Sequence, residues 1–212
     1  CDPEITIGLP KSLTAACGVD ALTHCIEAYT VQLHQPITDA LALKGISMIA
    51  ENLEKAYENG EDREARRNMM IASTIGGMAF ISSNVGAVHA FAETVGAWFD
   101  TPHGVANSLF LPYIMEFNIP ACPERFADIA DAMGIEREES MSDEQYALKA
   151  VEYVKALNRK LNIPTIKEIK GITEERFEAI AERSANNVLS NDNARKITKE
   201  DYLELLKKAY NE

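Results

Sequence analysis

Asp20 and His24 lie four residues apart near the start of the chain. On a helix this spacing places both side chains on one face, so a carboxylate and an imidazole can reach the same cation. Such a pair alone is more often a local hydrogen bond than a metal site. It becomes informative only if further ligands reach the same place.

Two more histidines lie in segments with very few charges. His89 follows Gly86-Ala87-Val88, and His103 follows Thr101-Pro102. Taken alone, His89 is more often a hydrogen-bonded core histidine, and His103 a residue at a helix start, than a metal ligand. Three imidazoles and one carboxylate together suit Fe, Zn or a similar first-row ion and leave room for a substrate oxygen. The sequence therefore predicts a metal site formed by Asp20, His24, His89 and His103.

His103 and His34 are predicted to have different roles. The sequence places His103 at a helix start, where the positive end of the helix dipole favours the neutral imidazole that a metal requires. His34 lies in the polar stretch Gln32-Leu33-His34-Gln35 and is predicted to be a surface residue.

These ligands must be positioned by helices, because apolar residues recur with a helical period through most of the chain. In the first half, the patterns predict helices over Thr14–Tyr29 (capped by Ser12 or Thr14), from Pro36 to before Gly60, after Asp62, over Val85–Phe99, and from Thr101-Pro102 onward. The Val85–Phe99 helix has few charges and should be central.

Gly76 and Gly77 interrupt the helix that follows Asp62. A glycine inside a helix costs about 1 kcal/mol relative to alanine. We therefore expect close packing against a neighbouring helix as compensation.

The second half of the chain is more charged, and its helices are more amphipathic. Helix starts are predicted at Ser142 with Gln145 as a capping box (ending near Leu161), at Thr173, and at Thr198 with Asp201. The segment Ile163–Gly171 is the best candidate for a loop. No strand-like alternation or hairpin dipeptide is present, so the predicted fold class is all-α.

Composition limits the classes of partner. The 212 residues contain 33 acidic and 21 basic side chains, a formal net charge of −12, which argues against nucleic-acid binding. No apolar run approaches the ~20 residues of a membrane span. Cys1, Cys17, Cys25 and Cys122 form no CxxC pair, which is typical of reduced thiols in a cytoplasmic protein. The start, Cys1-Asp2-Pro3, reads like the interior of a longer protein.

Several motifs, in order, resemble signatures of the iron-containing (group III) alcohol dehydrogenases. The first signature is matched by Leu9-Pro10-Lys11, Thr14-Ala15-Ala16, Gly18, Asp20-Ala21-Leu22-Thr23-His24 and Ile26-Glu27-Ala28-Tyr29. The second is matched by Val88-His89-Ala90, Gly96, Pro102-His103-Gly104-Val105-Ala106-Asn107 and Leu111-Pro112, and Thr38-Asp39-Ala40-Leu41-Ala42 is similar to the segment between them. The resemblance is strong from Cys1 to about Asn118 and looser beyond it.

This resemblance implies that residues 1–212 form the C-terminal helical metal and substrate domain, a bundle-like α domain of the dehydroquinate synthase type. It implies the same four metal ligands, Fe²⁺ as the metal with Zn²⁺ as the alternative, and NAD(P) in the full-length enzyme. The N-terminal dinucleotide-binding domain, with its Gly-Gly-Gly-Ser loop, is absent from this sequence. The family pattern also places Leu13 and Phe80 near the nicotinamide and the substrate pocket.

Glu93 departs from the family pattern. Many members have a second histidine four residues after the third ligand, near the cofactor and the proton path, and here that position is Glu93. Two readings stay open: Glu93 relays a proton as a catalytic residue, or it is a hydrogen-bonded structural replacement.

The expected function is the metal-binding part of an NAD(P)-dependent dehydrogenase that interconverts a small alcohol or diol and its aldehyde or ketone. Without the nucleotide-binding domain, its expected partner, the chain should bind metal but catalyse little. We also expect a homo-oligomer. The alternatives are a zinc-dependent enzyme like glycerol dehydrogenase and a non-catalytic metal-binding helical fragment. A di-iron bundle is disfavoured because no histidine has a glutamate three residues before it.

Overall fold

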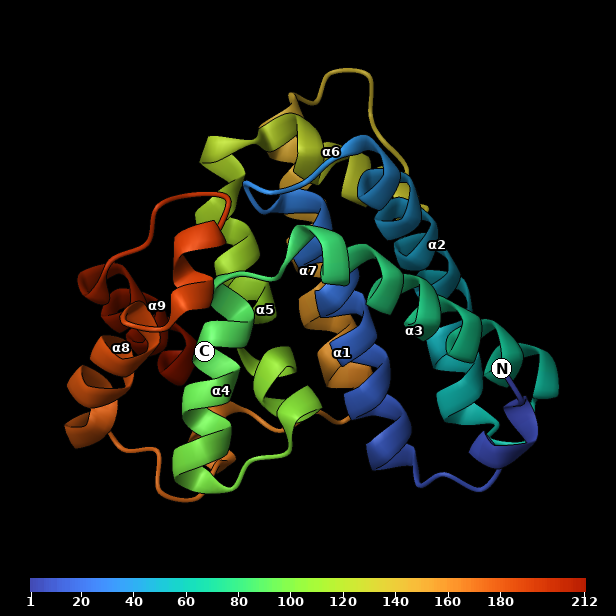
Figure 1. Cartoon of the computed structure of the whole chain (residues 1–212), viewed down its shortest axis with the longest axis horizontal. Coiled ribbons are helices and arrows are strands. Elements are labelled where there is room, and N and C mark those ends of the chain that lie inside the picture. Colours follow the sequence, from blue (N-terminus) through green and yellow to red (C-terminus); the bar gives the residue numbers. More distant parts are fainter.

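The computed structural model describes residues 1–212 and confirms the all-α class, since it contains only α-helices and short 3₁₀ helices (Figure 1). The α-helices are α1 (Lys11–Thr30), α2 (Pro36–Glu58), α3 (Arg63–Ser83), α4 (Ala87–Phe99), α5 (His103–Asn118), α6 (Pro123–Ala132), α7 (Asp143–Lys160), α8 (Phe177–Ala185) and α9 (Lys199–Asn211). The 3₁₀ helices are η1 (Pro3–Thr6), η2 (Ile119–Ala121), η3 (Ile166–Glu168), η4 (Glu174–Arg176) and η5 (Val188–Asp192).

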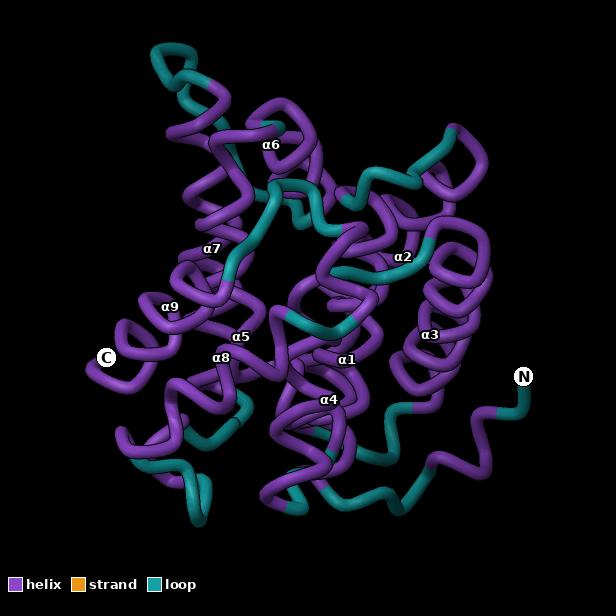
Figure 2. Tube along the Cα trace, turned by 60° about the vertical axis from the view of Figure 1, so that its left-hand side comes forward, coloured by secondary structure: helices purple, strands orange, loops and turns teal.

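Helix α1 runs through the middle of the molecule, with α2 and α3 on one side and α4 and α5 on the other (Figure 1). Most of its residues are buried, which is why its sequence is apolar on nearly every face. Helices α8 and α9 lie beyond α4 and α5, on the side away from α2 and α3 (Figure 2). The centre of the bundle therefore carries the segments that the metal-site prediction depends on.

Small residues let the helices around α1 approach closely. A Cβ added to Gly76 would lie 3.1 Å from the Cys25 sulfur, so the expected close packing is confirmed there. The same expectation is wrong for Gly77, because no atom lies within 4 Å of the position that its Cβ would take.

The predicted helix starts are partly confirmed. Asp62 and Ser142 cap α3 and α7 with their side chains, and Thr198 forms the predicted capping box of α9. Helix α1 instead begins earlier, at Lys11, with Pro10 as its N-cap and no side-chain cap, so the Ser12 or Thr14 cap is wrong.

Two further predicted helix starts differ from the structure, and one helix was not predicted. Helix α5 begins at His103 with Pro102 in the N-cap position. Thr173 makes no capping hydrogen bond and precedes η4. Helix α6, which begins with Pro123 at its first position, was not predicted. At the starts of α5 and α6, proline fixes φ without offering a side-chain acceptor, so no cap residue marks the first position.

Pro112 lies inside α5, where its missing N–H leaves the carbonyl of Ser108 without its helical partner. Asn158 of α7 compensates, because its side-chain amide donates to the Ser108 carbonyl oxygen at 2.7 Å. The Ser108 carbonyl thus receives its hydrogen bond from a neighbouring helix.

No single helix is long and apolar enough to cross a membrane. Only α3 and α4 taken together have the required length and composition, and they meet at a 105° bend.

Candidate metal centre

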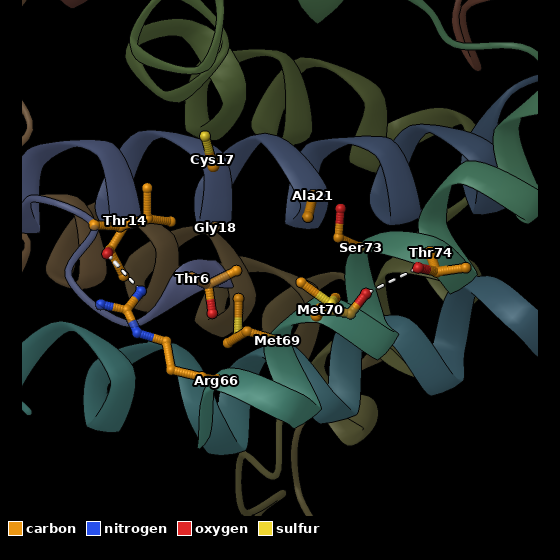
Figure 3. Close-up of a pocket in the computed structure, with 11 residues that line it drawn as sticks. Thr6, Thr14, Cys17, Gly18, Ala21, Arg66, Met69, Met70, Ser73 and Thr74 are labelled. Atoms are coloured by element: carbon orange, nitrogen blue, oxygen red, sulfur yellow. Dashed lines mark hydrogen bonds between the residues drawn. The ribbon is translucent and has the colours of Figure 1, made fainter. Parts of the chain in front are cut away.

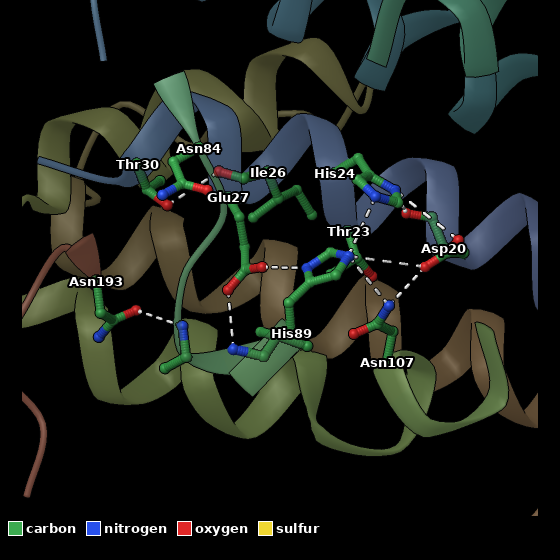
Figure 4. Close-up of polar contacts among 12 residues, drawn as sticks. Asp20, Thr23, His24, Ile26, Glu27, Thr30, Asn84, His89, Asn107 and Asn193 are labelled. Carbon is green, nitrogen blue, oxygen red and sulfur yellow. Dashed lines mark hydrogen bonds and ion pairs between the residues drawn. The ribbon is translucent and has the colours of Figure 1, made fainter. Parts of the chain in front are cut away.

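The structure brings the four predicted ligand residues together from three helices. Figure 4 shows Asp20 and His24 of α1 facing His89 of α4. The Nε2 atoms of His24 and His89 are 3.1 Å apart. The Asp20 Oδ1 atom lies 3.6 Å from Nε2 of His103 and 3.9 Å from Nε2 of His89. Ligand atoms of Asp20, His89 and His103 all lie within 4.8 Å of one another, which is the spacing that one shared cation needs.

The meeting of α1 and α5 depends on Gly104, directly after His103. A Cβ at this position would lie 2.3 Å from the carbonyl oxygen of Ala16 and 2.7 Å from its carbonyl carbon. Because both atoms belong to the α1 backbone, no side-chain movement can relieve the contact. Glycine is therefore the residue that lets the first turn of α5 reach Asp20.

His89 is oriented by a buried carboxylate on α1. Its Nδ1 lies 2.5 Å from Oε2 of Glu27, whose other oxygen, Oε1, accepts a hydrogen bond from the backbone N–H of Val88 at 2.8 Å (Figure 4). Glu27 is only 3% exposed. Since the carboxylate accepts from Nδ1–H, neutral His89 presents a lone pair at Nε2.

His24 is oriented in the same sense by the backbone. Its Nδ1 donates to the carbonyl oxygen of Asp20 at 2.8 Å, so its Nε2 also carries a lone pair. Two neutral imidazoles therefore face each other with acceptor atoms, an arrangement that a proton or a shared cation must stabilise. This observation shows that the residues fit a metal.

Asn107, one turn after His103, points its amide into the same space. Its Nδ2 lies 2.5 Å from Asp20 Oδ1, 3.1 Å from His103 Nε2 and 3.2 Å from His89 Nε2. An amide has only two N–H groups, so it cannot donate to all three acceptors at once. Its Oδ1 atom is buried without a hydrogen-bond partner. The acceptors at this point thus outnumber the donors, which again fits a cation.

The electrostatics of the two facing imidazoles differ. Burial and the neighbouring His89 lower the pKa of His24. Burial also acts to lower the pKa of His89, but the hydrogen bond and charge of Glu27, helped by Asp20 and Glu93, raise it overall. His24 is thus held neutral, whereas His89 holds a proton more tightly until a cation displaces it.

The remaining predicted residues lie around this cluster. Phe80 of α3 packs on His24, with ring centroids 4.5 Å apart. Leu13 is exposed on the first turn of α1. Glu93 is exposed and accepts a hydrogen bond from Asn187 at 2.6 Å. His34 is an exposed residue 3.4 Å from Asp39, so its predicted surface position is confirmed.

A cavity of about 240 Å³ lies between α1, α3 and the N-terminal segment (Figure 3). Its lining includes Cys17 and Ala21 of α1 but none of the four predicted ligands. Burial raises the pKa of Cys17, and the negative charge of Asp20 raises it further. Arg66 lines it with its guanidinium, which donates to Thr14 Oγ1 at 2.7 Å.

Sequence reasoning missed the roles of Glu27 and Asn107. A signal was present for Glu27, because an acid inside the apolar run Cys25–Val31 must be paired when it is buried. Asn107 follows His103 by four residues and therefore shares its helix face. No spacing rule, however, identifies which helix supplies the partner of either side chain.

Comparison with known proteins shows the family of the chain. The C-terminal part of the Fe-containing alcohol dehydrogenase family matches residues 14–210. Alcohol dehydrogenase 4 of Saccharomyces cerevisiae is 43% identical over 212 residues, covering 99% of this chain and 53% of the yeast protein. The 1,3-propanediol dehydrogenase of Klebsiella pneumoniae is 40% identical over 209 residues, covering 99% and 54%.

A solved structure shows the same fold. The crystal structure of a 1,3-propanediol oxidoreductase superposes with a TM-score of 0.95 at 40% identity, covering 98% of this chain and 54% of the other. The chain spans about half the length of the curated relatives it matches.

Proposed function

The chain belongs to the Fe-containing alcohol dehydrogenase family, and from that premise we propose that it forms the metal and substrate part of an NAD(P)-dependent alcohol dehydrogenase. The proposed reaction interconverts a small primary or secondary alcohol, or a diol, and its aldehyde or ketone. The two lone pairs facing each other at 3.1 Å, beside the carboxylate of Asp20, are the observation that carries the proposal.

Asp20, His24, His89 and His103 would hold the metal, which we propose to be Fe²⁺. A divalent cation held there supplies Lewis-acid polarisation of the substrate oxygen, and a nicotinamide supplies or accepts the hydride. The chain's own contribution is to aim the Nε2 atoms of His24 and His89 at one point beside the Asp20 carboxylate. The exposed side of His103 leaves that point open for a small substrate.

Leu13 and Phe80 are proposed to border the nicotinamide and the substrate. Phe80 packs against His24 with tilted rings, so it can limit the size of a substrate beside the ligand cluster. Leu13, exposed at the start of α1, offers an apolar surface to a cofactor ring. Binding of the dinucleotide by a further domain, and assembly into a homo-oligomer, remain predictions.

For Glu93 we favour the structural role over proton transfer. Its carboxylate accepts a hydrogen bond from Asn187, the N-cap of η5, which ties α4 to the C-terminal segment. A proton relay would need a free carboxylate within reach of the reacting oxygen. Glu93→Gln should therefore keep turnover and its pH profile in the complete enzyme.

A chimera tests the proposed function. Residues 1–212 would replace the matching 209 residues of the Klebsiella 1,3-propanediol dehydrogenase. Loaded anaerobically with Fe²⁺, the chimera should oxidise 1,3-propanediol with NAD⁺ or NADP⁺, and His89→Ala should reduce turnover to background. A folded, metal-loaded chimera without turnover on small alcohols or diols would contradict the proposal.

A further inference from the structure

Glu27 is a buried acid whose only charged partner is a histidine. Its side chain is 3% exposed, and both of its oxygens are engaged by the first turn of α4. Neither lysine nor arginine lies within ion-pair distance of it; the one ion pair it makes is with His89. A buried carboxylate is costly unless it is fully hydrogen-bonded and near a positive charge. Burial of this carboxylate therefore indicates a specific role.

We propose that Glu27 is a positioning residue that fixes the tautomer and ring orientation of His89 toward the metal. Since Oε2 accepts from Nδ1–H, the Nε2 atom of His89 stays unprotonated and faces Nε2 of His24. A carboxylate in this position also makes the imidazole a better donor to a cation. This inference rests on the metal site of the proposed function and adds to it the residue that orients one ligand.

Orienting His89 requires a carboxylate, because two hydrogen-bond donors converge on the Glu27 side chain. One is the backbone N–H of Val88 and the other is Nδ1–H of His89. A glutamine offers one acceptor oxygen and one NH₂ group. If its oxygen accepts from Val88, its NH₂ group faces Nδ1, and His89 must carry its proton on Nε2, where it blocks the metal.

The backbone around Glu27 is built to hold this geometry. A Cβ on Gly86 would lie 3.1 Å from Glu27 Oε1 and 3.1 Å from the Asn193 side chain. Asn193 lies within hydrogen-bond distance of the N–H of Ala87, and the Tyr202 hydroxyl donates to the Ala87 carbonyl at 3.1 Å. The C-terminal segment thus secures the start of α4, on which the Glu27–His89 contact depends.

The test compares Glu27→Gln with the unaltered chain and with Asp128→Asn. Asp128 accepts a hydrogen bond from Tyr29 and touches no ligand residue, so its amide variant controls for the loss of one carboxylate near α1. The ring ¹⁵N shifts of His89, measured without metal at a pH where the ring is neutral, report the tautomer. Titration with Zn²⁺ reports the affinity.

We expect the unaltered chain and Asp128→Asn to show the Nδ1–H tautomer and equal affinity. Glu27→Gln should shift His89 to the Nε2–H tautomer and weaken Zn²⁺ binding by about 10–100-fold. An Nδ1–H tautomer in Glu27→Gln, or equal weakening in both variants, would overturn the proposal. The Nε2–H tautomer in the unaltered chain would overturn it even if Glu27→Gln fails to fold.

The tautomer measurement needs no metal, so it decides the role of Glu27 separately from the proposed function. If the unaltered chain shows the Nδ1–H tautomer but takes up no Zn²⁺, the metal proposal fails while the hydrogen-bond assignment stands.

Discussion

The Nε2 atoms of His24 and His89 lie 3.1 Å apart, although the other nitrogen of each ring is already committed to an acceptor. His24 comes from α1 and His89 from α4, so the contact joins two helices. The facing Nε2 lone pairs repel each other unless a proton or a cation lies between them.

Metal affinity should fall in acid because of His89. Its pKa is raised in the metal-free protein, so it holds a proton at a pH where an ordinary histidine would be neutral, whereas the pKa of His24 is lowered. A cation must displace that proton, so affinity should increase by about tenfold per pH unit below the pKa of His89 and level off above it. Calorimetry in buffers of different ionisation enthalpy should count about one proton released.

His34→Ala is the matched control for this experiment, since His34 is exposed and outside the cluster. It should leave both the proton count and the affinity unchanged. Metal affinity that is flat through the histidine range in the unaltered chain would contradict the role of His89.

Gly104→Ala should damage both stability and metal binding. Its Cβ would lie 2.3 Å from a backbone oxygen of α1, so α5 must shift and carry His103 away from Asp20. We expect a loss of about 1–3 kcal/mol in the free energy of unfolding. Thermal and denaturant unfolding, with Zn²⁺ titration, measure the two effects.

Gly77→Ala provides the opposite case in α3. Its Cβ would meet no atom within 4 Å, so the variant should be more stable by about 0.5–1 kcal/mol and keep its metal affinity. If Gly104→Ala were as stable as Gly77→Ala, the close approach of α5 to α1 would not be needed.

Asn158→Ala should destabilise the protein through α5. It removes the donor to the Ser108 carbonyl, which Pro112 has already deprived of its helical partner. The expected cost is about 1–3 kcal/mol in the free energy of unfolding. Asn211→Ala, which removes a similar side-chain-to-carbonyl bond at the exposed end of α9, should cost much less.

A double-mutant cycle separates this effect from general loss of packing. Pro112→Ala restores the N–H that can bond to Ser108, so Asn158→Ala should cost less in that background. Equal costs in both backgrounds would mean that Asn158 acts by packing alone.

The all-α class and most helices could be predicted from sequence, because apolar periodicity and acceptor caps such as Asp62 and Ser142 are local signals. The starts at Lys11 and His103 could not, since both follow a proline that caps without a side-chain bond. The i, i+4 spacing of Asp20 and His24 is also local. The contribution of Glu27 depends on which helix packs against it, and that is decided by tertiary contacts that no single segment encodes.

The most direct test of the metal centre is anomalous X-ray diffraction from crystals of the chain grown with Zn²⁺. We expect one strong peak about 2.0–2.2 Å from a carboxylate oxygen of Asp20 and from Nε2 of His24, His89 and His103. Nδ1 of His89 should remain hydrogen-bonded to Glu27. A crystal grown with Zn²⁺ that shows no peak between these four side chains, or a peak elsewhere on the molecule, would contradict the proposed metal centre.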